Sequence, residues 1–127
     1  MSLGREQRES LGRAVLEKLA MMKIPCAILA VDESHVHALI RAGGIDAVRV
    51  FGRAKQFSSH RMRKDFPGKL WGASSHAVRI RNLGHMSATV SYIRKHRTRG
   101  AWVWEWSEGL ARMGLVGLSD GEAGPPS

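Results

Sequence analysis

The chain has 127 residues, which is enough for one domain with a modest core. Hydrophobic residues make up 43% of it, a share that excludes a wholly disordered protein. Lys and Arg number 20 against 11 Asp and Glu, and the resulting net charge of +9 favours a polyanionic partner such as nucleic acid.

The N-terminal half predicts a helix and then two strands. Apolar residues recur at helical spacing over residues 5–22, whereas the short apolar run over 24–31 is typical of a buried strand. A tight turn over 32–34 leads into a second strand over 35–41. Because so few residues join the two runs, we expect an antiparallel hairpin.

A second helix and a third extended segment are predicted next. Asp46 is suited to cap a helix whose apolar stripe begins at Ala47. The opposite face of that helix carries basic side chains. Residues 69–81 lack a helical stripe, so we expect a further strand there.

The C-terminal part predicts one more helix and one more strand. The helix begins near Met86 and is stopped by Gly100. Three tryptophans then alternate, as on a short strand packed on the sheet or against a partner subunit: Trp102, Trp104 and Trp106. We expect one domain over residues 1–118 and a flexible tail over 119–127.

Cellular setting follows from two further features. Cys26 is the only cysteine, so no intrachain disulfide can form, and a reducing cytoplasm is the natural environment. No apolar run approaches the roughly 20 residues of a membrane span, and we recognise no signal peptide. We therefore expect a cytoplasmic protein with no membrane partner.

The first chemical motif is His35-Val36-His37. Residues two apart in a strand project from the same face, so both imidazoles point one way while Val36 enters the core. Two ligands of one metal ion need that geometry, and an imidazole pair suits zinc, manganese, iron or nickel. Two incidental histidines on a half-exposed strand are the alternative interpretation.

The second motif lies on the last predicted helix. Tyr92 and His96 are four residues apart and share one helix face, and Tyr92 is the only tyrosine. A helical tyrosine commonly serves packing alone. Here Arg94 and Lys95 would favour the phenolate and hold a phosphate near it. The two motifs together supply a nucleophile and a metal for phosphodiester cleavage.

Three segments, in this order, resemble the HUH single-tyrosine transposases, a group that includes insertion-sequence and REP-associated transposases. Residues 28–40 resemble the hairpin around the His-hydrophobic-His motif, Leu70-Trp71-Gly72 resembles a Trp-containing strand, and Tyr92 to His96 resembles the tyrosine helix. The resemblance covers roughly residues 8 to 104. In three places the chain departs from the family: no strand is found before the first helix, Glu33-Ser34 replaces a common Pro-Asn, and His96 stands where the family often has Gln.

The resemblance implies an α+β, RRM-like (ferredoxin-like) antiparallel sheet with helices packed on it, lacking the family's first strand. It implies that His35, His37 and His96 hold Mg²⁺ or Mn²⁺, and that Tyr92 attacks a scissile phosphate and becomes joined to the 5′ end. The implied partners are hairpin-containing single-stranded DNA and a second copy of the chain, with the protein associated with the nucleoid.

The side chains that we predict to contact DNA are Arg49, Arg53, Lys55, Arg79, Arg81, Arg94, Lys95 and Arg97. Two other functions stay open. One is a transposase-derived DNA-binding protein that no longer cuts. The other is a small metal-dependent hydrolase that uses the histidine pair, with Tyr92 serving only the structure.

Overall fold

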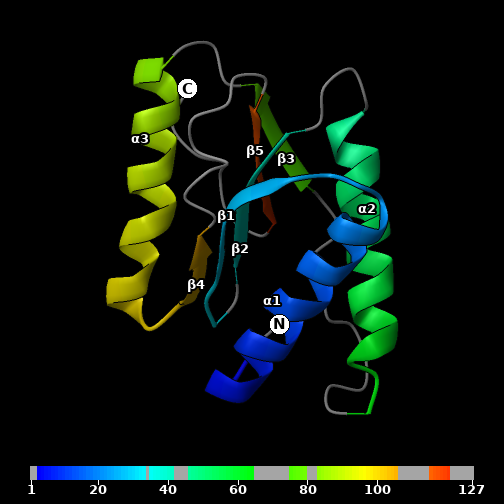
Figure 1. The fold of residues 1–127 in the computed structure, drawn as a ribbon. Coiled ribbons are helices and arrows are strands. Elements are labelled where there is room, and N and C mark those ends of the chain that lie inside the picture. Colours follow the sequence, from blue (N-terminus) through cyan, green and yellow to red (C-terminus); the bar gives the residue numbers. More distant parts are fainter. Residues whose placement is uncertain are drawn as a thin grey trace.

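The computed structural model describes residues 3–33, 35–41, 46–64, 75–79, 83–105 and 115–120 (Figure 1). The helices are α1 (Arg5–Met21), α2 (Ala47–Arg61), α3 (Leu83–Arg94) and a 3-10 helix, η1 (Lys95–Arg99). The strands are β1 (Cys26–Val31), β2 (Val36–Arg41), β3 (Ser75–Arg79), β4 (Trp102–Glu105) and β5 (Leu115–Asp120).

The strands form one antiparallel sheet in the order β3-β5-β2-β1-β4. β1 and β2 form the predicted hairpin, in which Val31 pairs with Val36 and Ala30 with His37. A bulge between Cys26 and Ile28 shifts the register at the start of β1. β2 is an interior strand, so the residues on it lie over the middle of the sheet.

This α+β architecture corresponds to a ferredoxin-like fold without its first strand, as expected. In a complete ferredoxin-like arrangement, which runs β-α-β-β-α-β, the first strand is an interior one between the third and the last. Here β5 lies in the corresponding place, paired with β2 on one side and β3 on the other. A strand from the C-terminal end of the chain therefore takes the position that the N-terminal end leaves open.

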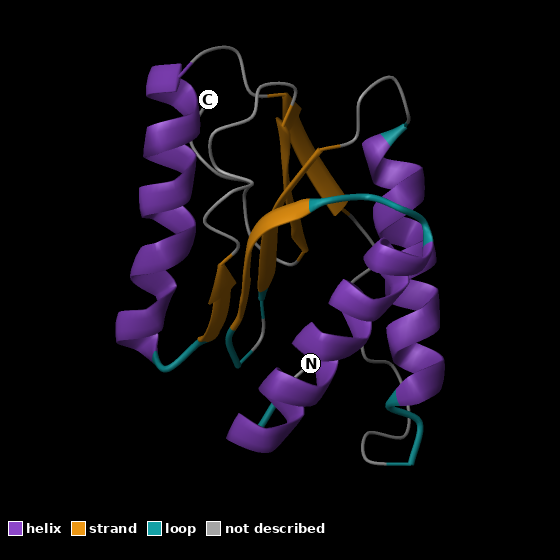
Figure 2. Ribbon diagram, viewed as in Figure 1, coloured by secondary structure: helices purple, strands orange, loops and turns teal. Residues whose placement is uncertain are grey.

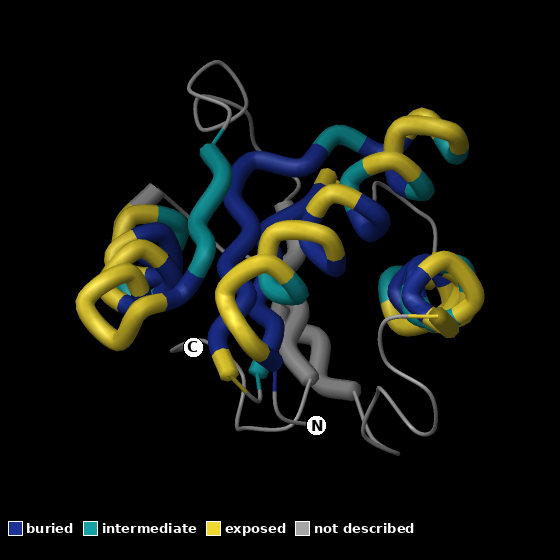
Figure 3. Tube along the Cα trace, turned by 90° about the horizontal axis from the view of Figure 1, so that it is seen from below, coloured by how far each residue is buried: buried dark blue, intermediate teal, exposed yellow. Residues whose placement is uncertain are grey.

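The helices lie on both faces of the sheet (Figure 2). α1 and α2 pack together against one face, whose core includes Leu29, Val36 and Ile40. α3 covers the other face, where Val90 and Ile93 pack against residues of β1 and β2. The view along the layers shows buried strands between helices whose outer sides are exposed (Figure 3). Consecutive β2 residues thus face different layers.

Local chemistry sets the ends of several elements. The Asp46 carboxylate accepts hydrogen bonds from the backbone N–H groups of Val48 and Arg49, so the predicted cap of α2 is confirmed. Gly100 ends η1 with φ +83°, a left-handed conformation that glycine adopts without steric cost. This turn directs the chain from the α3 layer into β4.

α1 and β4 approach each other closely at Gly12. A β-carbon added to Gly12 would overlap the six-membered ring of Trp102, so only glycine fits beneath this indole. Arg13 lies on the same ring, with its guanidinium carbon 5.5 Å from the centroid. Trp102 and Trp104 both pack against the α1 side core, which confirms the expected packing role for these two; Trp106 lies outside the described residues.

Most expected elements are present, with shifts at their ends. α3 begins at Leu83 rather than near Met86, and the strand expected over 69–81 is described only as β3. β5 was not foreseen; it contains Ser119 and Asp120, which we had placed in the C-terminal tail. Among the described residues, no helix has both the length and the apolar character needed to cross a bilayer.

Candidate active site

His37 lies at the centre of the candidate site because it occupies the interior strand β2. Its side chain has no exposed surface. It pairs with Ala30 of β1 and Ser119 of β5, and its ring faces the α3 layer. Val36 belongs to the core on the opposite face, as the strand alternation predicts. The fold therefore places an imidazole between the sheet and the tyrosine helix.

His35 is positioned by the turn that joins β1 to β2. The Asp32 carboxylate, in a residue only 7% exposed, accepts a hydrogen bond of 2.7 Å from the backbone N–H of His35. The same oxygen lies 3.4 Å from His35 Nδ1. A carboxylate on that side favours a proton on Nδ1. Asp32 thus fixes both the position of His35 and its preferred tautomer.

His96 is held from the helix side, at the start of η1. Its Nδ1 lies 2.9 Å from the backbone oxygen of Tyr92 and 3.3 Å from that of Ile93. Since carbonyl oxygens only accept, Nδ1 must carry the proton, and Nε2 carries the lone pair. His96 is 2% exposed, and within the described part of the chain its Nε2 has no hydrogen-bond partner. A buried lone pair of this kind is well suited to a metal ion.

Four rings from β2, its preceding turn and the α3–η1 segment meet at this place. The centroid of His37 lies 4.4 Å from that of His96 and 5.4 Å from that of Tyr92. Tyr92 and His96 are 5.1 Å apart, and His35 and His37 are 6.4 Å apart. We call His35, His37, Tyr92 and His96 the ring cluster. Side chains separated by more than fifty positions in sequence thus come into contact.

The protonation state of His37 suits a ligand role. Burial above all, followed by the positive charge that His96 would carry, lowers the pKa of His37 from 6.5 to about 3. Arg99 lowers it further, while Asp32 opposes the shift. The ring is therefore neutral near pH 7, which is the form that binds a metal.

Donor type and spacing decide how well the ring cluster fits a divalent ion. With metal–nitrogen bonds of about 2.1 Å, two imidazoles on one ion have centroids roughly 4.5 to 6.5 Å apart. The His37–His96 spacing lies at the short end and the His35–His37 spacing at the long end. Among the described residues, no three His, Cys, Asp or Glu side chains already surround one point as ligands. The residue types of the ring cluster therefore suit a divalent ion, and His35 is the histidine that lies farthest from the others.

One cation of η1 lies close to the tyrosine, and two further cations of α3 and η1 are held by a carboxylate of β4. Lys95 Nζ lies 5.6 Å from the centroid of the Tyr92 ring. Arg94 and Arg97 both contact Glu105 of β4, at 2.6 and 3.5 Å. Of the predicted DNA contacts, Arg94, Lys95 and Arg97 are therefore the ones that the structure brings to the tyrosine helix.

Three of the remaining predicted DNA contacts lie away from the ring cluster. Arg49, Arg53 and Lys55 belong to α2, in the layer on the opposite face of the sheet from α3. Arg79 is part of β3, of which the structure describes only the backbone, and Arg81 lies outside the described residues. Helical spacing shows which α2 residues share a face, but it cannot show which side of the sheet the helix covers.

Sequence reasoning missed several side chains around the site. Asp32 was read only as a turn residue, and Arg99 was not singled out, although its charge acts on His37. His85 and Thr89 are 6% and 0% exposed on α3, where the Thr89 hydroxyl donates to the His85 carbonyl oxygen. Helical spacing had placed positions 89, 92 and 96 on one face, and position 85 extends this polar stripe by one more turn.

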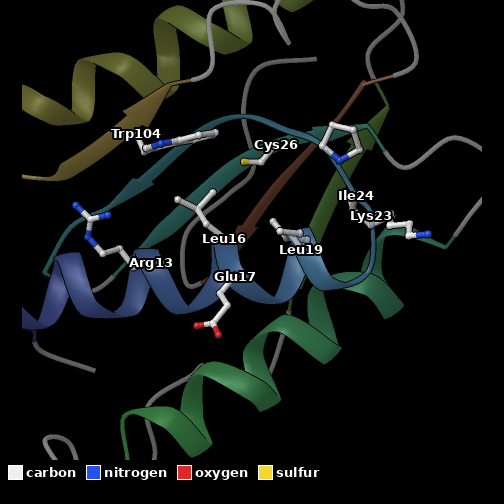
Figure 4. A pocket seen from close by; sticks show the side chains of 10 residues that line it. Arg13, Leu16, Glu17, Leu19, Lys23, Ile24, Cys26 and Trp104 are labelled. Carbon is white, nitrogen blue, oxygen red and sulfur yellow. The ribbon is translucent and has the colours of Figure 1, made fainter.

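A separate, mostly apolar hollow of about 590 Å³ lies between α1 and the β1–β4 side of the sheet (Figure 4). Leu16, Leu19 and Cys26 point into it, and Trp104 closes one end. Burial raises the pKa of the Cys26 thiol to about 12, which leaves it un-ionised and supports a core role. This hollow lies on the face away from the ring cluster and has no part in it.

Comparison of the chain with protein-family models, with curated proteins and with solved structures gives no match in any of the three.

Proposed function

We propose that this protein is a metal-dependent, single-tyrosine transposase that cuts and rejoins single-stranded DNA. The observation that supports this proposal is the ring cluster, in which the only tyrosine lies 5.4 Å from a neutral, buried histidine of the sheet. A packing role for Tyr92 alone gives no reason for the two buried imidazoles beside it. A nucleophile next to a metal site accounts for all of the rings.

The proposed reaction is a transesterification at one phosphodiester. The Tyr92 oxygen attacks phosphorus, its proton passes to solvent, and the bond to the 3′ oxygen breaks. The 3′ oxygen takes up a proton and leaves as a hydroxyl, while the 5′ phosphate stays on Tyr92. Because the phosphotyrosine keeps the energy of the broken bond, a 3′ hydroxyl can attack it and rejoin the strand without ATP.

The roles of the chain's own residues follow from their positions. His35, His37 and His96 would hold Mg²⁺ or Mn²⁺, and such an ion withdraws charge from the non-bridging phosphate oxygens. Asp32 orients His35, and the Tyr92 carbonyl oxygen orients His96. Lys95 stabilises the phenolate and the incoming phosphate. The proposal includes hairpin-containing single strands as substrate, a homodimer, and a nucleoid-associated location in the cytoplasm.

One observation favours a second candidate, a transposase-derived DNA-binding protein that no longer cuts. Among the described residues no three His, Cys, Asp or Glu side chains surround one point as ligands, and His35 is the outlying member of the ring cluster, with its centroid 6.4 Å from that of His37. In that case the basic surface would still bind nucleic acid while the ring cluster would serve only packing.

The two candidates differ in whether a covalent adduct forms. We expect wild-type protein with Mn²⁺ and a hairpin-containing single strand to give a protein–DNA adduct on a denaturing gel, and Tyr92→Phe to give none. Because Tyr92 is the only phenol, no other tyrosine can replace it. Binding without any adduct in the wild type would support the non-cutting candidate. Cleavage that survives Tyr92→Phe would indicate a hydrolase.

The metal ligands are tested by His35→Ala against a matched control, His60→Ala. His60 is exposed on α2, in the other layer. We expect His35→Ala to abolish the adduct and the thermal stabilisation by Mn²⁺, yet to leave salt-sensitive DNA binding largely intact, since the phosphate contacts are separate. His60→Ala should behave as wild type. Equal stabilisation by Mn²⁺ in both variants would exclude His35 as a ligand.

A further inference from the structure

The outer face of α3 and η1 carries a shallow hollow of about 410 Å³. It is lined by Ser91, Arg94, Lys95, Arg97 and Thr98, which we call the basic hollow. Positions 91, 94, 95 and 98 follow helical spacing, so they share one face. Three cations and the Ser91 hydroxyl supply N–H and O–H donors there, while the Thr98 hydroxyl is engaged with a backbone carbonyl and no carboxylate is among the lining residues. Such a set of donors is complementary to a phosphate group.

Glu105 of β4 orders two of these cations from the edge of the basic hollow. Arg94 makes a two-pronged contact with it, through Nη2 at 2.6 Å and Nε at 3.2 Å. Arg97 Nη2 reaches the same carboxylate at 3.5 Å. Each guanidinium has five N–H donors, so both retain donors for a further anion. Glu105 therefore fixes the two planar groups without using up their capacity.

Lys95 joins the basic hollow to the nucleophile. Its ammonium makes no ion pair within the described residues, and its Nζ lies 5.6 Å from the centroid of the Tyr92 ring. The Thr98 hydroxyl donates to the Lys95 carbonyl oxygen at 2.7 Å, which stabilises the turn that carries the lysine. A phosphate bound by Lys95 would therefore lie within one helical turn of Tyr92.

We propose that the basic hollow binds a backbone phosphate of single-stranded DNA beside the nucleotide that Tyr92 attacks, and that the α2 cations take no part. The identity of the polymer rests on the proposed function. The choice of this binding place rests on charge, because three cations line the basic hollow on α3 and η1 and only the Glu105 carboxylate lies beside them. The cations Arg49, Arg53 and Lys55 lie in the layer on the other face of the sheet. The hollow thus sets the path of the strand across α3.

The test compares the salt dependence of binding in matched variants. Lys95→Ala is paired with Lys64→Ala, and Arg97→Ala with Arg53→Ala; both controls remove an exposed cation of the α2 segment. Binding of a short labelled single strand is measured by anisotropy over a salt series, in EDTA and with Tyr92→Phe as background. We expect each hollow variant to lower the slope of log K against log salt by about 0.7, the value for one single-strand phosphate contact, and each control to leave it unchanged.

The opposite result would overturn the inference: unchanged slopes in Lys95→Ala and Arg97→Ala, or an equal fall in the controls. Arg97→Lys keeps the charge and should keep the slope, which separates a lost contact from a misfolded variant. The background excludes cleavage, so the outcome is independent of the adduct experiment. If the wild type forms an adduct but the salt slopes of the variants are unaffected, the transposase proposal stands and the phosphate-binding role of the basic hollow is wrong. If the slope depends on Lys95 but no adduct forms, the basic hollow binds phosphate and the transposase proposal is wrong.

Discussion

His37 is a titratable side chain without any exposed surface, on an interior strand. Burial keeps the ring neutral at pH values where a free histidine is half protonated. His96 is held in another way, since its Nδ1 donates to the Tyr92 carbonyl oxygen at 2.9 Å. Packing and one backbone contact thus hold two buried imidazoles side by side.

The lowered pKa of His37 predicts a pH dependence of stability. Between pH 6.5 and about 3 the unfolded chain binds a proton at residue 37 that the folded chain does not. The free energy of unfolding therefore includes a contribution that is intact above pH 6.5 and is lost as the pH falls toward 3. We expect His37→Gln to reduce this loss by up to a few kcal/mol, measured by denaturant unfolding in EDTA at pH 7 and pH 4. An identical pH dependence in the variant would contradict the assigned burial.

How far the site could be predicted differs from one residue to another. The alternation of β2 placed His35 and His37 on one face, and helical spacing placed Tyr92 and His96 together, because both follow from local periodicity. Asp32 was not foreseen, since its contact with His35 depends on the conformation of one turn. Arg99 acts on His37 across the gap between η1 and β2, a relation that no local spacing expresses.

At the scale of elements, the contact between α1 and β4 determines how close the helix can lie to the sheet. Gly12 is the closest point, beneath Trp102. A second helical glycine, Gly52 of α2, has nothing within 4 Å of an added β-carbon. The two positions share a helical environment and differ only in what surrounds them.

The two glycines predict opposite effects of alanine substitution on the free energy of unfolding. Gly52→Ala should stabilise the protein by about 0.5 to 1 kcal/mol, because alanine loses less backbone entropy in a helix. Gly12→Ala should destabilise it by about 1 to 3 kcal/mol, because the methyl group overlaps the indole and forces α1 and β4 apart. Thermal unfolding of the two variants, followed by circular dichroism, measures both. A stabilised Gly12→Ala would show that the indole can move aside at little cost.

The elements themselves were largely accessible to sequence reasoning, but their placement was not. The turn at Asp32 and the cap at Asp46 are short-range signals, and both mark the ends that they predicted. β5 was not predicted because residues 115–120 contain a glycine and show no clear alternation of apolar and polar residues. The layer occupied by α2 depends on long-range pairing, and this is why its three basic residues were grouped with those of α3.

For the whole molecule, the strand order makes β5 the strand that connects β3 to the rest of the described sheet. In the described sheet, β3 pairs only with β5. β2 pairs with β1 on one side and with β5 on the other. Loss of β5 would remove the β-ladder partners of two strands and expose the edge beside His37.

A truncation series tests this role. A chain that stops before Leu115 should lose cooperative unfolding and tend to aggregate, because an interior strand is missing and a long edge is left unpaired. A chain that stops after Asp120 is the control and should unfold with nearly the wild-type midpoint, since the β5 pairing ends there. Urea unfolding and light scattering measure both effects. A fully cooperative transition in the shorter chain would mean that β5 is dispensable.

The position of β5 also bears on how the molecule is made. Synthesis runs from the N-terminus, so the segment that completes the middle of the sheet leaves the ribosome after every other described element. Until residue 120 has emerged, β2 and β3 lack the strand that pairs with both of them, and His37 lies on an unpaired strand edge. The sheet around His37 can therefore be completed only after residues 115–120 have emerged, and until then the nascent chain needs protection from pairing with other strands.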